Sequence, residues 1–166
     1  PILLQKAAEI RDTDTLGSLY FDRLYPLGVT AMLEAVDLVR AGQAPRIVQD
    51  ETQATYEGWC KAENVPIDWH KPLQEVWNLI RGADPQPGAW TSHDGVSVQI
   101  YDTKKHVGTT TGRPGEITAI GEASFTVAAA GGQIEVLRVR AAGGQKISAA
   151  AFATSVGLRP GVQLGG

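Results

Sequence analysis

The pattern of hydrophobic and polar positions changes period close to residue 89. Beyond that point apolar residues alternate with polar ones, and Val96, Val98 and Ile100 give the clearest signal of a half-buried strand. The same alternation returns in three short segments: 117–120, 124–128 and 133–139. Turn signals separate these segments, so we expect short antiparallel strands that form a small open β-barrel.

Helical spacing dominates the N-terminal part instead. The run Asp12–Thr15 offers several helix caps, and we expect the helix that follows it to stop or kink near Pro26. A second helix should extend from Val29 to Arg40, with Gly42 at a left-handed C-cap. Residues 1–10 fit a short strand. Together these elements indicate the last strand and helices of a larger α/β unit.

Two further helices should accompany the sheet and give an α+β fold. The first has Pro72 in its first turn and ends near Gly82. Its apolar stripe consists of Leu73, Val76, Trp77 and Ile80. The second should run from about Ser148 to Ser155, capped by Ser148 and ended by Gly157. Between the N-terminal helices and this part, residues 44–57 lose all periodicity, which indicates a linker.

Charge narrows the classes of function. The 166 residues have a net charge of −3; residues 1–57 hold 5 Lys/Arg against 9 Asp/Glu, and residues 58–166 hold 10 against 9. Neither part has the strongly basic balance that phosphate-driven nucleic-acid binding usually needs. No apolar run is long enough to cross a bilayer, and no signal peptide is visible. We therefore expect a cytoplasmic protein without DNA or membrane partners, for which RNA binding would need a local patch.

Candidate reactive residues are few. The three histidines, His70, His93 and His106, show no metal-ligand spacing to one another or to Cys60, so we expect no metal site. Cys60 lacks a paired base, which favours a buried or half-buried structural cysteine over a catalytic thiolate. Four tryptophans occur between residues 59 and 90. Their mixed neighbours favour packing between linker, helix and barrel over a base-stacking platform.

A series of short motifs gives the most specific signal in the chain. In order they are Ala54–Gly58, Ile67-Asp68-Trp69, Lys71-Pro72, Asn78–Arg81 and Pro87–Thr91. The series resembles the linker and the start of the C-terminal domain in the folate-dependent formyltransferase family. Branches of this family include methionyl-tRNA formyltransferase and the hydrolase domain of 10-formyltetrahydrofolate dehydrogenase. Tyr56-Glu57-Gly58 and the near-neutral C-terminal half look more like the dehydrogenase branch.

The resemblance covers nearly the whole chain and implies its domains. Residues 1–43 would be the end of a Rossmann-like α/β catalytic domain, residues 44–69 a linker, and residues 70–166 an OB-like C-terminal barrel. In the family an Asn, a His and an Asp polarise the formyl carbonyl and move protons, and they precede the point where this chain begins. We therefore expect a fragment that is inactive alone and binds no cofactor. Its partner would be an N-terminal catalytic domain that uses 10-formyltetrahydrofolate as formyl donor in one-carbon metabolism.

Two candidate sites follow. The resemblance places Tyr56 in a linker that passes near the mouth of the active site, where it would line the substrate channel or anchor the linker by burial. Arg138, Arg140 and Lys146 form the best basic group. Because Arg138 and Arg140 alternate on one strand, both can point outward, either as a solvated face or as a contact for RNA or another partner.

The function retains alternatives at this point. The favoured parent transfers or hydrolyses the formyl group of 10-formyltetrahydrofolate, and the acceptor stays open among water, methionyl-tRNA, an amino sugar and a carrier-bound amino acid. The alternative parent is methionyl-tRNA formyltransferase, whose C-terminal domain would bind and position initiator tRNA. Two other roles are an independent module that positions a large substrate and a structural spacer that docks against the catalytic domain.

Overall fold

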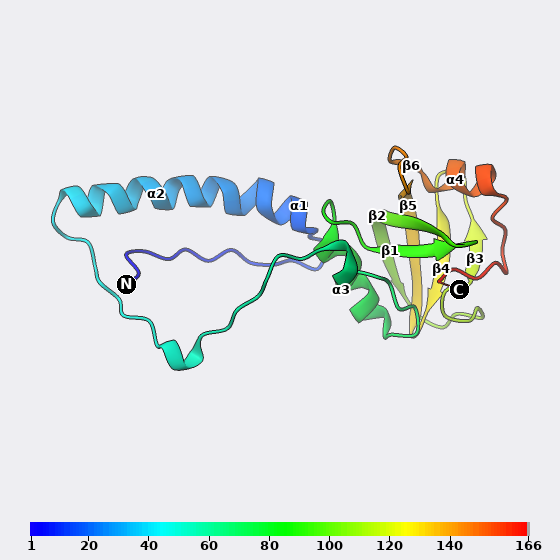
Figure 1. The fold of residues 1–166 in the computed structure, drawn as a ribbon, viewed down its shortest axis with the longest axis horizontal. Helices are drawn as coiled ribbons and strands as arrows, with labels where there is room; N and C mark the ends of the chain where they lie inside the picture. The colour runs from blue at the N-terminus through cyan, green and yellow to red at the C-terminus, as the bar shows by residue number, and fades with distance from the viewer. Residues whose placement is uncertain (166) are drawn as a thin grey trace. The chain divides into compact units, whose positions relative to one another are not determined.

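A computed structural model describes residues 1–165 of the chain, which separates into two compact units, Pro1–Trp59 and Cys60–Gly166. We refer to them as unit 1 and unit 2, and Figure 1 labels their elements. Unit 1 consists of one long helical run and extended segments. Unit 2 contains a six-stranded antiparallel sheet and the helices α3 and α4.

The helical run of unit 1 begins with a reciprocal cap. The Thr15 side chain accepts a hydrogen bond from the N–H of Ser18, and the Ser18 side chain accepts one from the N–H of Thr15, both at 3.1 Å. The run consists of α1 Leu16–Leu19, the π-helix η1 Tyr20–Leu24 and α2 Tyr25–Arg40. Gly42 follows with φ +68°, which confirms the left-handed residue predicted after the helix.

The helix was expected to stop or kink near Pro26; it does not stop, and a π-helical irregularity precedes the proline instead. In the π-helical turn the N–H of Tyr25 donates to the carbonyl of Tyr20, five residues earlier. In a regular α-helix the proline ring would collide with the carbonyl four residues before it and leave that carbonyl without its donor. The wider turn shifts the carbonyls out of that position. The chain therefore continues as α2 with Pro26 in its first turn.

The prediction of a strand over residues 1–10 is wrong. Ile2 pairs with Ile47 through two hydrogen bonds of 2.8 and 3.0 Å, and residues 3–10 form no strand. A strand persists only where a neighbouring strand satisfies its N–H and C=O groups, and the described residues of unit 1 supply none. Residues 44–57, which follow, contain one short turn of 3₁₀-helix, η2 Glu51–Gln53, capped by Asp50. The Rossmann-like assignment of residues 1–43 stays a prediction.

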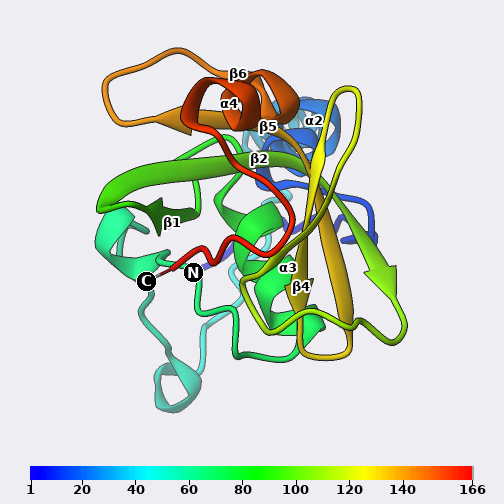
Figure 2. The same cartoon turned by 90° about the vertical axis from the view of Figure 1, so that its right-hand side faces the viewer.

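Unit 2 confirms the α+β class with a barrel-like C-terminal domain. Its elements are η3 Ala62–Asn64, α3 Leu73–Ala83, β1 Trp90–His93, β2 Val96–Val107, β3 Ile117–Ile120, β4 Phe125–Ala129, β5 Gly132–Ala141, β6 Ile147–Ser148 and α4 Ala149–Val156. The strand order is β1-β2-β5-β4-β3, with β6 beside β5, and every pairing is antiparallel. The sheet is strongly curled, and α3 packs against β2 and β5 (Figure 2).

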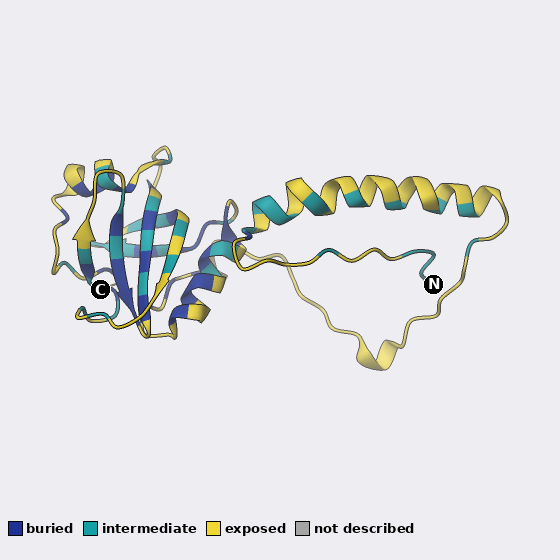
Figure 3. Cartoon of the chain, turned by 180° about the vertical axis from the view of Figure 1, so that it is seen from behind, coloured by how far each residue is buried: buried dark blue, intermediate teal, exposed yellow. Residues whose placement is uncertain are grey.

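The core of unit 2 lies between α3, α4 and the sheet. The stripe predicted from the sequence is buried on α3, and the N–H of Leu73 donates to the carbonyl of Ala130 at 2.8 Å. Helix α4 begins at Ser148, whose hydroxyl accepts the N–H of Ala151, and ends at Gly157 with φ +68°. Figure 3 shows buried positions along α3 and the strands, whereas α2 of unit 1 is mainly exposed.

In β2 and β5 the regular alternation of buried and less buried residues is interrupted, and the sheet bends there. In β5 the buried residues step by two from Ile134 to Val136, and then by three to Val139. Asp102 in β2 has a left-handed backbone with φ +47°, which aspartate tolerates better than most residues. Just before it, Tyr101 is buried out of phase with β2 and lies outside the main core cluster. This bend carries the basic residues singled out in the sequence.

Candidate functional site

Arg138 and Arg140 lie on one face of β5, next to two residues of β2. In the antiparallel register Arg138 is paired with Tyr101, and Arg140 is paired with Gln99. Directly paired residues share a face of the sheet, and so do residues two apart on one strand. The sheet therefore places all four side chains on the same face.

Lys146 joins this face from the β5–β6 hairpin. Its Nζ lies 3.8 Å from the centroid of the Tyr101 ring, and the Arg140 guanidinium carbon lies 5.8 Å from the same centroid. The guanidinium of Arg138 donates from Nη2 to the backbone carbonyl of Lys146 at 3.1 Å. Arg140 donates from Nε to the Gln99 side-chain oxygen at 2.7 Å. The structure thus gathers Arg138, Arg140 and Lys146, which we call the basic group, around Tyr101.

Two carboxylates lie within reach of the basic group. Asp84 is only 6% exposed and accepts the backbone N–H of Asp102 at 3.1 Å, whereas the Asp102 carboxylate is 4.0 Å from Nε of Arg138. Burial raises the pKa of Asp84, opposed by the Asp102 N–H and by the positive charge of Lys146. Burial likewise raises the pKa of Tyr101. The sequence patterns did not find Asp84 or Tyr101, because their roles depend on a contact between a turn and a distant hairpin.

Tyr56 and its neighbours are placed differently from expectation. Tyr56 is 91% exposed and Trp59 is 92% exposed, so neither anchors the linker by burial within this chain. Cys60 is also exposed, which corrects the expectation of a buried or half-buried cysteine. An irregular segment that packs against nothing in its own unit leaves even large apolar side chains in solvent. A role for Tyr56 in a substrate channel stays a prediction.

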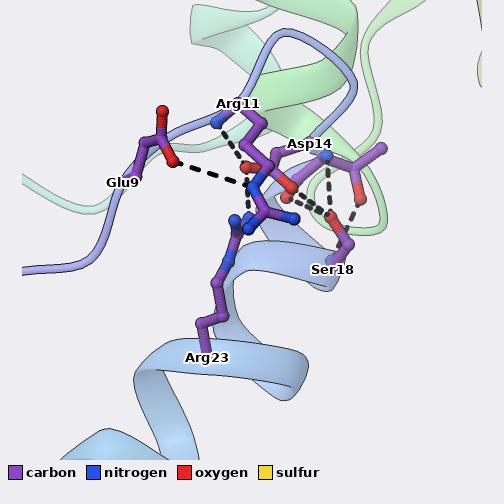
Figure 4. Close-up of polar contacts among 6 residues, drawn as sticks. Glu9, Arg11, Asp14, Ser18 and Arg23 are labelled. Atoms are coloured by element: carbon purple, nitrogen blue, oxygen red, sulfur yellow. Dashed lines mark hydrogen bonds and ion pairs between the residues drawn. The ribbon is translucent and has the colours of Figure 1, made fainter.

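A second polar cluster surrounds Asp14 at the start of the helical run (Figure 4). The Asp14 carboxylate accepts the backbone N–H of Arg11 at 2.6 Å, pairs with the Arg23 guanidinium and accepts the Ser18 hydroxyl at 3.4 Å. The hydrogen bond from Arg23 is the main reason that the pKa of Asp14 is lowered, followed by the Arg11 N–H. Nε of Arg23 is buried and has no hydrogen-bond partner among the described residues. The sequence indicated Asp14 only as one of several helix caps.

The helical run of unit 1 carries an uncovered apolar surface. None of its residues is buried. Its large exposed apolar residues are Leu16, Tyr20, Phe21, Leu24, Tyr25, Val29, Met32, Leu33, Val36 and Val39, which we call the helix face. Seven residues of the run between Tyr20 and Leu33 line an open groove of about 440 Å³. A continuous apolar surface of this kind marks an interaction site.

Unit 2 has a pocket of its own, with a volume of about 540 Å³. Three segments line it: 67–70, 113–114 and 163–165. Its ionisable side chains are Asp68, His70 and Arg113; Asp68 accepts the backbone N–H of His70, and Arg113 is paired with the carboxylate of Glu116 at 3.3 Å. All three side chains are more than half exposed, and these contacts join residues that are close in sequence.

The asparagines of this chain make local hydrogen bonds. The sequence holds two asparagines, Asn64 and Asn78. The side-chain oxygen of Asn64 accepts the N–H of Lys61 at 2.9 Å, and that of Asn78 accepts hydrogen bonds from Gln74 and Arg81. The absence from this chain of an Asn/His/Asp set for formyl transfer stays a prediction. No step of that chemistry is assigned to the described residues.

In the described part of the chain, no group of three or more His, Cys, Asp and Glu side chains is arranged to hold a metal ion. No helix there combines the length and the apolarity needed to cross a bilayer.

The fold and the uncovered helix face define an α+β domain of the barrel-like class joined to an interaction element. Residues 60–157 match the family described as formyl transferase, C-terminal domain. Because this match covers more than half of the sequence, the chain belongs to that family. The family resemblance seen in the motifs between Gln53 and Thr91 is confirmed.

Proteins of two kinds are similar to this chain. Mitochondrial 10-formyltetrahydrofolate dehydrogenase of Mus musculus is 46% identical over 101 residues, which cover 61% of this chain and 11% of the mouse protein. Methionyl-tRNA formyltransferase of Moorella thermoacetica is 34% identical over 164 residues, which cover 99% of this chain and 52% of the bacterial protein. The chain therefore spans about half of the second relative and about a tenth of the first.

Solved structures show the same fold. A substituted variant of HypX from Aquifex aeolicus superposes with a TM-score of 0.74 at 19% identity, covering 89% of this chain and 26% of HypX. HypX in complex with tetrahydrofolic acid gives a TM-score of 0.70 at 20% identity, covering 87% of this chain and 25% of that protein. At this identity the likeness describes the fold alone.

Proposed function

We propose that the chain is the C-terminal part of an enzyme that transfers or hydrolyses the formyl group of 10-formyltetrahydrofolate, and that it is inactive alone. In this account residues 1–43 complete a catalytic domain, residues 44–69 connect it to the barrel, and the enzyme works in the cytoplasm. Family membership supports the reaction class. The relatives support the existence of a separate catalytic part, because the residues that align with this chain cover only 11% and 52% of their length. The hydrolase or dehydrogenase type is favoured, because its mouse member has the higher identity.

The helix face is the observation that carries this proposal. Burial of apolar surface contributes about 25 cal/mol per Å², so a row of exposed aromatic and aliphatic side chains represents a large unrealised stabilisation. Such an uncovered surface is expected of an element whose covering residues belong to another part of the same enzyme.

An association experiment tests this assignment. The 166-residue chain, co-expressed with the N-terminal catalytic part of its parent enzyme, should co-purify with it. Leu33→Asp places a charge at the centre of the helix face and should abolish co-purification. Val107→Asp changes an exposed apolar residue at the end of β2 and serves as the matched control, which should co-purify normally. Equal recovery of both variants would exclude the helix face as the docking surface.

A second candidate function is contact with transfer RNA through the basic group. Arg138, Arg140 and Lys146 are brought to one face and held there, and bacterial methionyl-tRNA formyltransferases align with almost the whole chain. Asp84 and Asp102 offset part of the positive charge, so we expect weak binding. This favours a local contact over a broad electrostatic surface.

Salt dependence of binding distinguishes this candidate. Unfractionated transfer RNA should bind the chain at about 50 mM salt and weaken steeply by about 200 mM salt, because phosphate contacts release counterions. Lys146→Met should reduce the slope of log affinity against log salt by about 1. Lys104→Met is the control, because Lys104 lies on the same sheet but faces Glu135 at 3.8 Å. Absence of binding at the lower salt concentration would remove RNA contact from the account.

A further inference from the structure

Tyr101 is a buried tyrosine whose cover consists largely of charged side chains. Its exposed fraction is 1%, yet it lies outside the main core cluster and out of phase with the buried residues of β2. The ammonium of Lys146 sits over one ring face at 3.8 Å, and the guanidinium of Arg140 lies 5.8 Å from the ring centroid. An aromatic ring attracts cations through its negative face, so this contact is favourable and directional.

The turn before β1 holds the other end of the tyrosine. Gly88 has φ +87°, and a Cβ at this position would collide with the Tyr101 hydroxyl oxygen. The side-chain amide of Gln99 donates to the carbonyl of Pro87 at 2.8 Å, and the Gln99 oxygen accepts Nε of Arg140. Glycine is therefore required at residue 88 for the turn to close against the ring. The turn, Gln99 and Tyr101 together form a fixed base under Lys146 and Arg140.

These contacts leave hydrogen-bond donors of the basic group available. A contact between an ammonium and a ring face needs no acceptor atom, so Lys146 keeps its N–H donors. Arg140 uses Nε for Gln99, and a guanidinium carries further N–H groups on its two terminal nitrogens. Nearby, Asp84 and Asp102 offset part of the charge. Position, rather than net charge, must then decide whether an anion binds here.

We propose that Tyr101 is a positioning residue that holds Lys146 and Arg140 as an oriented site for one phosphate group. This inference rests on the second candidate function, RNA contact by the basic group, and specifies how that group recognises its ligand. Phosphate suits the site because Lys146 and Arg140 both lie against the Tyr101 ring with N–H donors to spare, and a phosphate offers several acceptor oxygens. The phosphate belongs either to an RNA backbone or to a free phosphate ion.

NMR spectroscopy of the free chain tests the placement first. The Tyr101 ring should shift the side-chain methylene protons of Lys146 upfield, and Tyr101→Phe should preserve that shift. Tyr101→Leu should abolish it, and the amide spectrum of each variant reports whether the fold is intact. Unshifted Lys146 protons in the unsubstituted chain would overturn the proposal without use of any ligand.

Ligand binding tests the site second. Inorganic phosphate should perturb the Lys146 and Arg140 side-chain signals, and Tyr101→Leu should weaken transfer RNA binding about 3-fold or more while Tyr101→Phe does not. Should Tyr101→Leu fail to fold, Lys146→Met against Lys104→Met tests whether Lys146 contributes to binding, and the upfield shift of the Lys146 methylene protons tests its position. Phosphate binding without RNA binding supports the site and removes the RNA function. Binding of neither ligand, or full RNA affinity in folded Tyr101→Leu, overturns the positioning role.

Discussion

Asp14 and Asp84 show how two identical side chains acquire opposite properties from their surroundings. Around Asp14, hydrogen bonds from Arg23 and from the Arg11 N–H outweigh burial, and the pKa of Asp14 falls. Around Asp84, burial outweighs one backbone N–H and the charge of Lys146, and the pKa rises. The first carboxylate stabilises a helix start; the second is tolerated beneath the basic group.

Replacement of Arg23 by Gln should move the pKa of Asp14 up towards its ordinary value of 3.8, because Arg23 is the largest cause of the shift. The folded-state pKa of Asp14 is below its unfolded value, so its contribution to stability is present above pH 3.8 and is lost as the pH falls through the folded-state pKa. NMR titration of the Asp14 carboxyl carbon measures the change. Asp50, whose lowered pKa depends on Thr52, should titrate identically in both proteins.

At the scale of single elements, α3 is held in place by a stripe of buried apolar residues, whereas α2 has no buried residue. Both helices are amphipathic or apolar in sequence, but only α3 finds a sheet to cover within its unit. Helical stability in proteins comes mainly from such packing rather than from propensity. The stripe of α3 should therefore determine the stability of unit 2.

Ile80→Ala should lower the free energy of unfolding of unit 2 by about 2–5 kcal/mol, because Ile80 is almost completely buried and its loss leaves a cavity. Val107→Ala removes apolar atoms from a side chain that is 80% exposed and should change stability by less than about 0.5 kcal/mol. Chemical denaturation followed by tryptophan fluorescence measures both. Similar losses in the two variants would contradict the assignment of α3 to the core.

Local sequence patterns predicted those elements whose packing partners lie in the same unit. The stripe from Leu73 to Ile80, the strand Ile117–Ile120 and the cap at Ser148 were found because their signals are local and their neighbours lie in the same unit. The π-helical turn before Pro26 was not predicted, because helix propensity does not show how a helix accommodates a proline. The contact of Lys146 with Tyr101 was not predicted either, because it joins residues 45 positions apart.

At the scale of the whole molecule, the chain combines a self-sufficient unit 2 with a unit 1 whose apolar residues are uncovered. Unit 2 has its own core and contains the whole family match, whereas the helix face, Tyr56 and Trp59 remain exposed. Sequence reasoning expected Trp59 to be packed, because it assumed that the packing partner was present in the chain. In the proposed enzyme, the covering residues belong to the catalytic part.

Formyl release from 10-formyltetrahydrofolate tests the central claim most directly. The purified 166-residue chain should release no formyl group above the uncatalysed rate, because the account assigns the Asn/His/Asp set to the N-terminal catalytic part. The same chain co-expressed with the N-terminal catalytic part should release or transfer the formyl group, and Leu33→Asp should remove that activity while Val107→Asp retains it. Activity of the chain alone, or no activity in the reconstituted pair, would contradict the account.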